Sequence, residues 1–256
     1  MSEQCPIVVL TSGGPQDWIM INALRERFGD FPIVLENEEP SKLFWRRRRK
    51  MLGALTVASM KTALFSMKFT KRKSEAVIDK MIADYDLKPE PAEGLNITRV
   101  DNINSWATRE ILRVENPKAV FVASTRLLDR KTLRSVSMPF INYHSGINPA
   151  YRGMFGGYFA LANREPENFG ATVHLIDQGV DTGEILYQSR VQVQPEDNFH
   201  TYLWRIAAGS RHIVVKAVQD AINHELRPRK VNLPSNQYFA PTLGGYLWTG
   251  MTRKVW

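Results

Sequence analysis

A short aliphatic run, two glycines and a helical repeat open the chain, and this order constrains the fold more than any other feature. Ile7 to Thr11 is a continuous run of mostly β-branched residues, and Gly13-Gly14 follow it after one serine. From Asp17 to Phe28 the apolar residues recur at helical spacing. A strand, a glycine turn and a helix in this order predict the first unit of a parallel α/β sheet.

The same alternation continues along the chain. Strands are predicted at 31–35, 96–100, 119–123, 140–143, 171–176 and 185–193, and helices at 75–85, 105–114, 129–135, 154–163 and 199–224. The aromatic, glycine-rich tail 238–256 is predicted to form a short strand and a loop. We therefore expect an α/β fold with a Rossmann-like, mostly parallel sheet, helices on both faces and a small C-terminal segment.

Length and composition favour one main domain. With 256 residues and 43% hydrophobic content, the chain can bury one large core, predicted as a domain 1–195 with the C-terminal segment 196–256 packed on it. Cys5 is the only cysteine, so an intrachain disulfide or a cysteine-rich metal site is excluded, and Cys5 is expected to be a small core residue. Since no secretory leader is recognisable, a cytoplasmic location is predicted.

The basic charge is concentrated in one segment. The net charge is +8, yet Lys42 to Lys73 hold eleven Lys or Arg and no acid, leaving 23 basic against 26 acidic residues elsewhere. Basic clusters alternate there with apolar stretches too short to span a membrane, which predicts one or two amphipathic helices in an insertion at 41–73. This arm is interpreted as a solvated face, a peripheral contact with an anionic membrane or nucleic acid, or a clamp for an anionic substrate.

The clearest candidate site combines an amide, an imidazole and a carboxylate. Asn142 and His144 end a predicted strand, where ligands bind in open α/β sheets, and Asp181 follows in a later loop. Acyl transfer to an amine requires stabilisation of an oxyanion and removal of one proton. Asn142 and His144 can donate to the oxyanion, while Asp181 can orient the imidazole and hold a proton-relaying water. This chemistry needs no metal.

These residues lie in two runs that resemble the signatures of the folate-dependent formyltransferase family. Asn142 to Gly153 resembles Asn-x-His-x-Ser-Leu-Leu-Pro-x-x-Arg-Gly without gaps, and Gly170 to Ile185 resembles the second signature. The family includes glycinamide ribonucleotide transformylase, methionyl-tRNA formyltransferase and sugar N-formyltransferases. The resemblance implies a formyltransferase fold, 10-formyltetrahydrofolate as formyl donor, and catalytic roles for Asn142, His144 and Asp181.

The same resemblance implies the binding residues. A folate pocket is expected at the positions Thr125, Arg126, Leu128, Asp177, Gln178 and Val180. Substrate contacts are expected from Ser12, Gly13, Gly14, Arg152, Gly153 and His174. Thr172 matches a position near the water network. The chain departs from the signature at Gly146, where the family has Ser, and at Asn148, where it has Leu.

Two departures bear on the formyl acceptor. In the first glycine turn Pro15 lacks an N–H and Asp17 would repel a phosphate, which disfavours glycinamide ribonucleotide. The tRNA enzymes carry a further C-terminal domain for which this chain leaves no room, so tRNA is not expected. The predicted acceptor is a small amine, best an amino sugar, either free or nucleotide-linked, with glycinamide ribonucleotide as the alternative.

Two rival functions remain open at this level. A formyltetrahydrofolate hydrolase would use the same catalytic residues. A non-catalytic membrane or nucleic-acid adaptor would act through the basic arm and bind no folate, with a steep dependence on salt. The oligomeric state is not readable, since the aromatic tail suits either a dimer interface or a cover for the active site.

Overall fold

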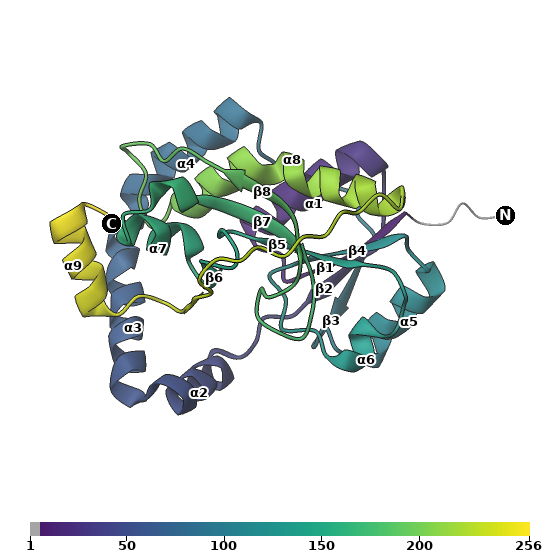
Figure 1. Cartoon of the computed structure of the whole chain (residues 1–256), viewed down its shortest axis with the longest axis horizontal. Helices are drawn as coiled ribbons and strands as arrows, with labels where there is room; N and C mark the ends of the chain where they lie inside the picture. The colour runs from purple at the N-terminus through teal and green to yellow at the C-terminus, as the bar shows by residue number, and fades with distance from the viewer. Residues whose placement is uncertain (1–5) are drawn as a thin grey trace.

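The computed structural model describes residues 6–256, without the side chains of Thr70 and Lys73, so Cys5 lies outside the described residues. Its centre is a seven-stranded sheet in the order β3-β2-β1-β4-β5-β7-β8 (Figure 1). The strands are β1 (Ile7–Thr11), β2 (Ile33–Glu36), β3 (Ile97–Val100), β4 (Ala119–Ala123), β5 (Phe140–His144), β7 (Gly170–Leu175) and β8 (Ile185–Arg190). β1 to β5 pair in parallel, while β7 and β8 are antiparallel to their neighbours. The predicted mostly parallel sheet is confirmed.

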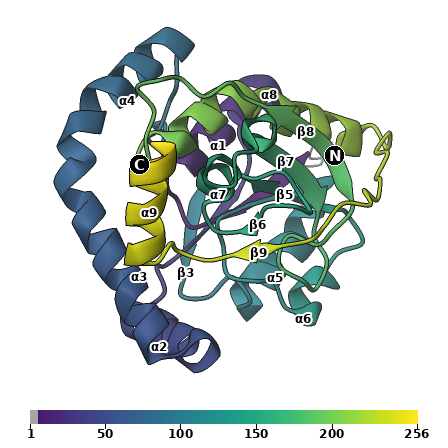
Figure 2. The ribbon, with the colours of Figure 1, turned by 60° about the vertical axis from the view of Figure 1, so that its left-hand side comes forward.

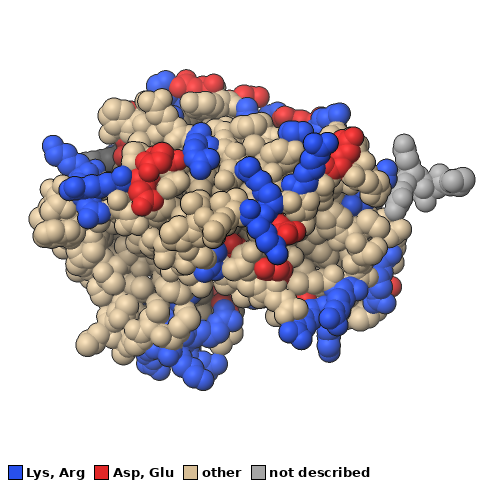
Figure 3. All heavy atoms as spheres, viewed as in Figure 1, with Lys and Arg blue, Asp and Glu red and all other residues tan. Residues whose placement is uncertain are grey.

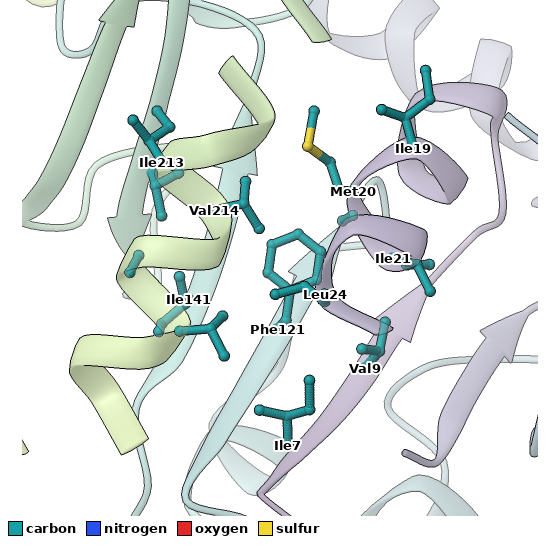
Figure 4. Close-up of a cluster of buried hydrophobic side chains, with 14 of the residues drawn as sticks. Ile7, Val9, Ile19, Met20, Ile21, Leu24, Phe121, Ile141, Ile213 and Val214 are labelled. Carbon is teal, nitrogen blue, oxygen red and sulfur yellow. The ribbon is translucent and has the colours of Figure 1, made fainter. Parts of the chain in front are cut away.

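Helices cover both faces of the sheet because the side chains of β1 alternate. Ile7 and Val9 pack with α1 (Pro15–Phe28) and α8 (Tyr202–Ile222), as Figure 4 shows. Val8 and Leu10 point to the opposite face. That face is covered by α5 (Trp106–Glu115) and α6 (Arg130–Leu133). Strands buried on both sides are typical of a doubly wound parallel sheet.

The basic arm consists of two helices that continue into a third. α2 (Ser41–Leu52) buries no residue, whereas α3 (Ala54–Met67) turns Val57, Met60, Ala63 and Met67 inward. A short 3₁₀ turn, η1 (Lys68–Thr70), leads into α4 (Lys71–Tyr85), which begins four residues before the predicted start. The predicted helices are confirmed, but part of the apolar surface of the arm belongs to the core.

α3 packs against two elements from the second half of the chain. Ala63 and Met67 share an apolar cluster with residues of α7 (Gly156–Ala162) and with Tyr246 of α9 (Leu243–Arg253). Figure 2 shows α9 lying alongside α3. No helix within residues 6–256 has the length and apolar character that crossing a bilayer requires.

The tail corrects one prediction. The short strand exists as β9 (Gln237–Tyr238), which pairs with β6 (Arg152–Gly153), but a helix follows where we predicted a loop. Glycines at 244, 245 and 250 lower the helix propensity that the sequence displays. Two effects compensate for the low helix propensity. The Thr242 side chain caps α9 locally, and Tyr246 is buried by tertiary packing. The remaining element is the 3₁₀ helix η2 (Pro166–Asn168), and β8 ends three residues earlier than predicted.

Candidate functional site

A cleft of ≈ 490 Å³ opens beyond the carboxyl ends of β4 and β5. The antiparallel pairing of β5 with β7 sets Asn142 opposite His174, and His144 opposite Thr172. The loop after β7 brings Asp181 to the same place. Asn142, His144, His174 and Asp181 all line this cleft. The predicted convergence of amide, imidazole and carboxylate is therefore present, with a second imidazole beside them.

Asp181 is the centre of this network. Its Oδ2 lies 3.5 Å from Nδ1 of His144, and its Oδ1 lies 3.4 Å from Nε2 of His174. The backbone N–H of Gly153 donates to Oδ2 at 2.9 Å. The side-chain amide of Asn142 donates to Oδ1 at 3.4 Å and lies 3.1 Å from Nε2 of His174. One carboxylate thus orients the other three side chains.

The far nitrogens of both imidazoles face backbone carbonyls. Nε2 of His144 lies 2.7 Å from the Tyr151 oxygen, and Nδ1 of His174 lies 2.8 Å from the Leu175 oxygen. A carbonyl only accepts, so each of these nitrogens carries a proton. The nitrogen that remains on each ring faces Asp181. Protonation of either ring at that nitrogen therefore creates an ion pair with the carboxylate.

The charges around Asp181 decide its ionisation. Burial by itself would raise the pKa of this carboxyl group. The charge of His144 lowers this pKa, and His174 and the backbone N–H of Gly153 lower it further. Together they hold the pKa of Asp181 well below its usual range. Asp181 is consequently a carboxylate at neutral pH.

The arrangement modifies the role expected for Asn142. Both amide protons of its side chain are directed at His174 and Asp181, so donation to an oxyanion requires that one of these contacts be given up. His174, predicted as a substrate contact, is 3% exposed and contacts Asp181 and Asn142. Thr172 supports the network from below, since its hydroxyl donates to the Gly146 oxygen at 2.8 Å.

Gly146, a departure from the family signature, is explained by the ring of His144. A Cβ at this position would overlap the Tyr151 oxygen and lie 2.5 Å from Nε2 of His144. We predict that Gly146→Ala displaces the imidazole and lowers turnover about 10²-fold, the effect of misplacing a catalytic group by about 1 Å. Steady-state kinetics with Gly244→Ala as control tests this, because nothing lies within 4 Å of a Cβ at Gly244. Equal turnover in the two variants would contradict it.

The side chain of Asp17 forms hydrogen bonds with the glycine turn before α1. Oδ2 of Asp17 accepts from the Thr11 hydroxyl at 3.0 Å and from the Gly14 N–H at 3.1 Å, while Ser124 donates to Oδ1 at 2.7 Å. Burial raises the pKa of Asp17 despite these hydrogen bonds. Neither Gly13 nor Gly14 lines the cleft, although Ser12 lines a neighbouring cavity. The side chain of Asp17 occupies the place where a phosphate would bind a helix N-terminus.

Arg152, predicted to contact substrate, holds two loops together. Its Nη1 donates to the Val180 oxygen at 2.7 Å and its Nε to Ser235 at 2.9 Å. The guanidinium lines neither the cleft nor the neighbouring cavity. Gly153 lines both, and its N–H fixes Asp181. Arg152 therefore positions the Asp181 loop in this structure.

The predicted folate positions fall mostly on the cleft. Thr125, Arg126, Leu128, Asp177 and Val180 line it, whereas Gln178 does not and instead accepts from Arg130 at 2.9 Å. The Arg126 guanidinium forms an ion pair with Glu36, a residue that sequence reasoning did not single out. That pair anchors the loop after β4 to the end of β2. The only signal for Glu36 was an acid at the end of a predicted buried strand.

A second cavity of ≈ 930 Å³ adjoins the cleft. It shares with the cleft Phe44, Arg48, Ser124, Thr125, Arg126, Leu127, Gly153, Met154 and Val180. The two spaces are thus parts of one depression, and α2 forms a wall of both. Within residues 6–256, no three His, Cys, Asp or Glu side chains are grouped as metal ligands.

Comparisons with known proteins agree with this architecture. A family described as "Formyl transferase" matches residues 50–218. The chain is 32% identical over 153 residues to a protein named methionyl-tRNA formyltransferase from Halothermothrix orenii, covering 57% of this chain and 48% of that protein. The chain spans about half the length of the curated relatives it matches.

Solved structures share the fold at low identity. A sugar N-formyltransferase from Shewanella sp FDAARGOS_354 superposes with a TM-score of 0.58 and 16% identity, covering 92% of this chain and 77% of that one. A sugar 3N-formyl transferase described in the presence of dTdp and 5-N-Formyl-THF has a TM-score of 0.54 and 14% identity, covering 93% and 70%. At these identities the likeness shows the fold alone.

Proposed function

The chain belongs to the formyl transferase family, and from this premise we propose that it transfers a formyl group from 10-formyltetrahydrofolate to a primary amine. The observation that carries the proposal is the network of Asn142, His144 and His174 around the ionised Asp181, at the carboxyl ends of parallel strands. Acyl transfer to an amine needs a carboxylate to take up a proton and N–H donors to stabilise the oxyanion, both in one cleft.

The cleft suits a folate. Its volume lies within the range of small-molecule sites, and apolar side chains form much of its wall, among them Val122, Leu127, Leu128, Ile176 and Leu203. The loops at 125–128 and 177–181 border it. A flat heterocycle between apolar walls can place its formyl group at the polar end of the cleft. The donor supplies an activated one-carbon unit, and the chain supplies position and charge.

The chemical roles follow from the contacts of each side chain. As the amine nitrogen bonds to the formyl carbon, negative charge develops on the formyl oxygen. His144 or Asn142 donates to this oxygen after giving up one of its present contacts, with Tyr151 or Asp181 for His144 and with His174 or Asp181 for Asn142. The amine must lose a proton, and Asp181 accepts it through a water molecule. The C–N bond of the donor then breaks, and the leaving nitrogen takes a proton from the same network. The carboxylate is regenerated, so one cycle leaves the site unchanged.

For the acceptor we propose an amino sugar carried on a nucleotide. Solved proteins of this fold include sugar N-formyltransferases, one of them described with dTdp. The second cavity gives room beside the catalytic cleft for a group larger than the amine itself. Asp17 fills the helix N-terminus where a phosphate could otherwise bind, which argues against the alternative, glycinamide ribonucleotide.

An amine on methionyl-tRNA is a second candidate acceptor. The curated relatives are named methionyl-tRNA formyltransferases, and the basic helix α2 borders the second cavity. Our expectation against tRNA rested on the length of the chain. Length carries no weight, because the chain spans about half of those relatives. The names of the relatives therefore run against that expectation.

A formyl-transfer assay over a panel of acceptors tests the proposal. The panel holds dTDP-linked amino sugars, glycinamide ribonucleotide, methionyl-tRNA and water alone, with formylated product detected by mass spectrometry. We expect product with a nucleotide-linked amino sugar. Formate release at the same rate with every acceptor would identify a hydrolase. Absence of both product and 5-formyltetrahydrofolate binding would refute the proposal and favour an adaptor that acts through the basic arm.

A further inference from the structure

Arg48 of α2 lies at the junction of the two cavities. Its guanidinium lines both of them. It lies over the rings of Phe239 and Phe44, at 4.6 and 5.1 Å from their centroids, and 3.9 Å from the sulfur of Met154. Among the described residues no carboxylate forms an ion pair with it. Burial lowers the pKa of Arg48 and the charge of Arg47 lowers it further, while the charge of Glu39 opposes both.

The other two guanidinium groups of the second cavity are already paired. Arg126 forms an ion pair with Glu36 and donates to the Asp101 and Asn37 oxygens. Arg47 forms an ion pair with Glu39. Glu38, the remaining carboxylate of the wall, is exposed. Arg48 is thus the guanidinium of this wall, within the described residues, that forms no ion pair, although the charge of Glu39 acts on it.

The position of α2 places this cation in reach of a ligand. Figure 3 shows Lys and Arg gathered over α2 at the lower edge of the molecule, where the surface is indented toward α5 and α6. α2 buries no residue of its own, and Arg48 contacts the body of the molecule through Met154 and Phe239. An arginine held on aromatic faces keeps its N–H fork directed and weakly hydrated, which suits a phosphate.

We propose that Arg48 binds a phosphate group of the formyl acceptor in the second cavity while the amine of the acceptor lies in the catalytic cleft. The inference rests on the proposed function and names the chemistry of its acceptor. The proposed phosphate site is Arg48 and not the N-terminus of α1, where the Asp17 side chain accepts hydrogen bonds from Thr11 and Gly14. The glutamate carboxylates of the folate are another source of oxyanions, so the test separates the two ligands.

The experiment is calorimetry on the full chain with dTDP, thymidine and 5-formyltetrahydrofolate as separate probes. Arg48→Ala should weaken dTDP binding by roughly 10- to 100-fold, the range for loss of a charged hydrogen-bonded pair. Thymidine and 5-formyltetrahydrofolate should bind as before. Arg49→Ala is the matched control, since Arg49 is exposed on the same helix and lines neither cavity, and it should change dTDP affinity less than about twofold.

Arg48→Lys guards against a folding artefact, because it keeps the charge and loses the planar fork, and should show an intermediate loss. Equal losses in Arg48→Ala and Arg49→Ala would overturn the proposal, as would a loss confined to 5-formyltetrahydrofolate or a wild type that does not bind dTDP. Arg48-dependent dTDP binding without formyl transfer would keep the phosphate site and remove the proposed activity. Formyl transfer with dTDP binding that does not depend on Arg48 would keep the proposed activity and remove the phosphate site.

Discussion

Asp181→Asn is expected to lower turnover by about 10²- to 10⁴-fold, the range for loss of a general base. Asparagine has nearly the same shape but cannot accept the proton of the amine. It also removes the charge that faces His144 and His174 at 3.5 and 3.4 Å. Single-turnover formyl transfer measures the chemical step, while calorimetry with 5-formyltetrahydrofolate shows whether the cleft still binds.

The control for this substitution is Asp84→Asn. Asp84 is a half-exposed carboxylate paired with Lys80 on α4, and it lines neither the cleft nor the second cavity. Its loss should leave turnover within about twofold, as expected for a surface ion pair. Turnover of Asp181→Asn at the level of this control would remove Asp181 from the mechanism.

The lowered pKa of Asp181 also predicts a pH dependence of stability. A carboxyl group whose pKa is lower in the folded than in the unfolded state stabilises the fold above its unfolded pKa of about 3.9. That stabilisation is lost as the pH falls through the folded value. The difference in unfolding free energy between wild type and Asp181→Asn should therefore be largest near neutral pH and shrink below about pH 4. Urea titrations at a series of pH values measure it, and a difference that grows on acidification would contradict the assignment.

His144→Ala is expected to cost about 10²- to 10³-fold in turnover, as loss of an oxyanion donor does. His144 lies between the Tyr151 oxygen and Asp181 and is 7% exposed, so its ring is held in one orientation. The substitution also removes the ring nitrogen that faces Asp181 at 3.5 Å. The expected loss is in kcat, with little change in the affinity for 5-formyltetrahydrofolate.

His212→Ala is the matched control, because His212 is exposed on α8 and lines no part of the cleft. Thermal melting of both variants separates loss of fold from loss of chemistry. If His144→Ala folds and turns over like His212→Ala, the imidazole has no part in the reaction. Added imidazole that restores activity to His144→Ala alone would support the assigned role.

The sequence predicted the order of strands and helices well because local patterns carry that information. A run of mostly β-branched residues such as Ile7 to Thr11 indicates a strand that is buried on both faces. The helical spacing of apolar residues from Asp17 to Phe28 indicates a helix that is buried on one face. The tail at 243–253 was predicted wrongly as a loop, since the packing of α9 against α3 depends on residues almost two hundred positions away. Propensity alone cannot register such a contact.

Asn142, His144 and Asp181 could be named from the sequence because their types, order and spacing are local properties of two signature runs. Their convergence, the entry of His174 into the network and the fit of Gly146 to the imidazole depended on the register between β5 and β7 and on the loop that returns Asp181. Likewise, the sequence contains the charged residues Asp17, Arg152 and Arg48, but only the fold decides which of them form hydrogen bonds within the chain. Asp17 and Arg152 are used by the chain itself, and Arg48 is left to face the cavity. The physical reason is that pairing of polar groups is settled by distances of a few ångströms between residues far apart in sequence, whereas strands and helices are settled by neighbours.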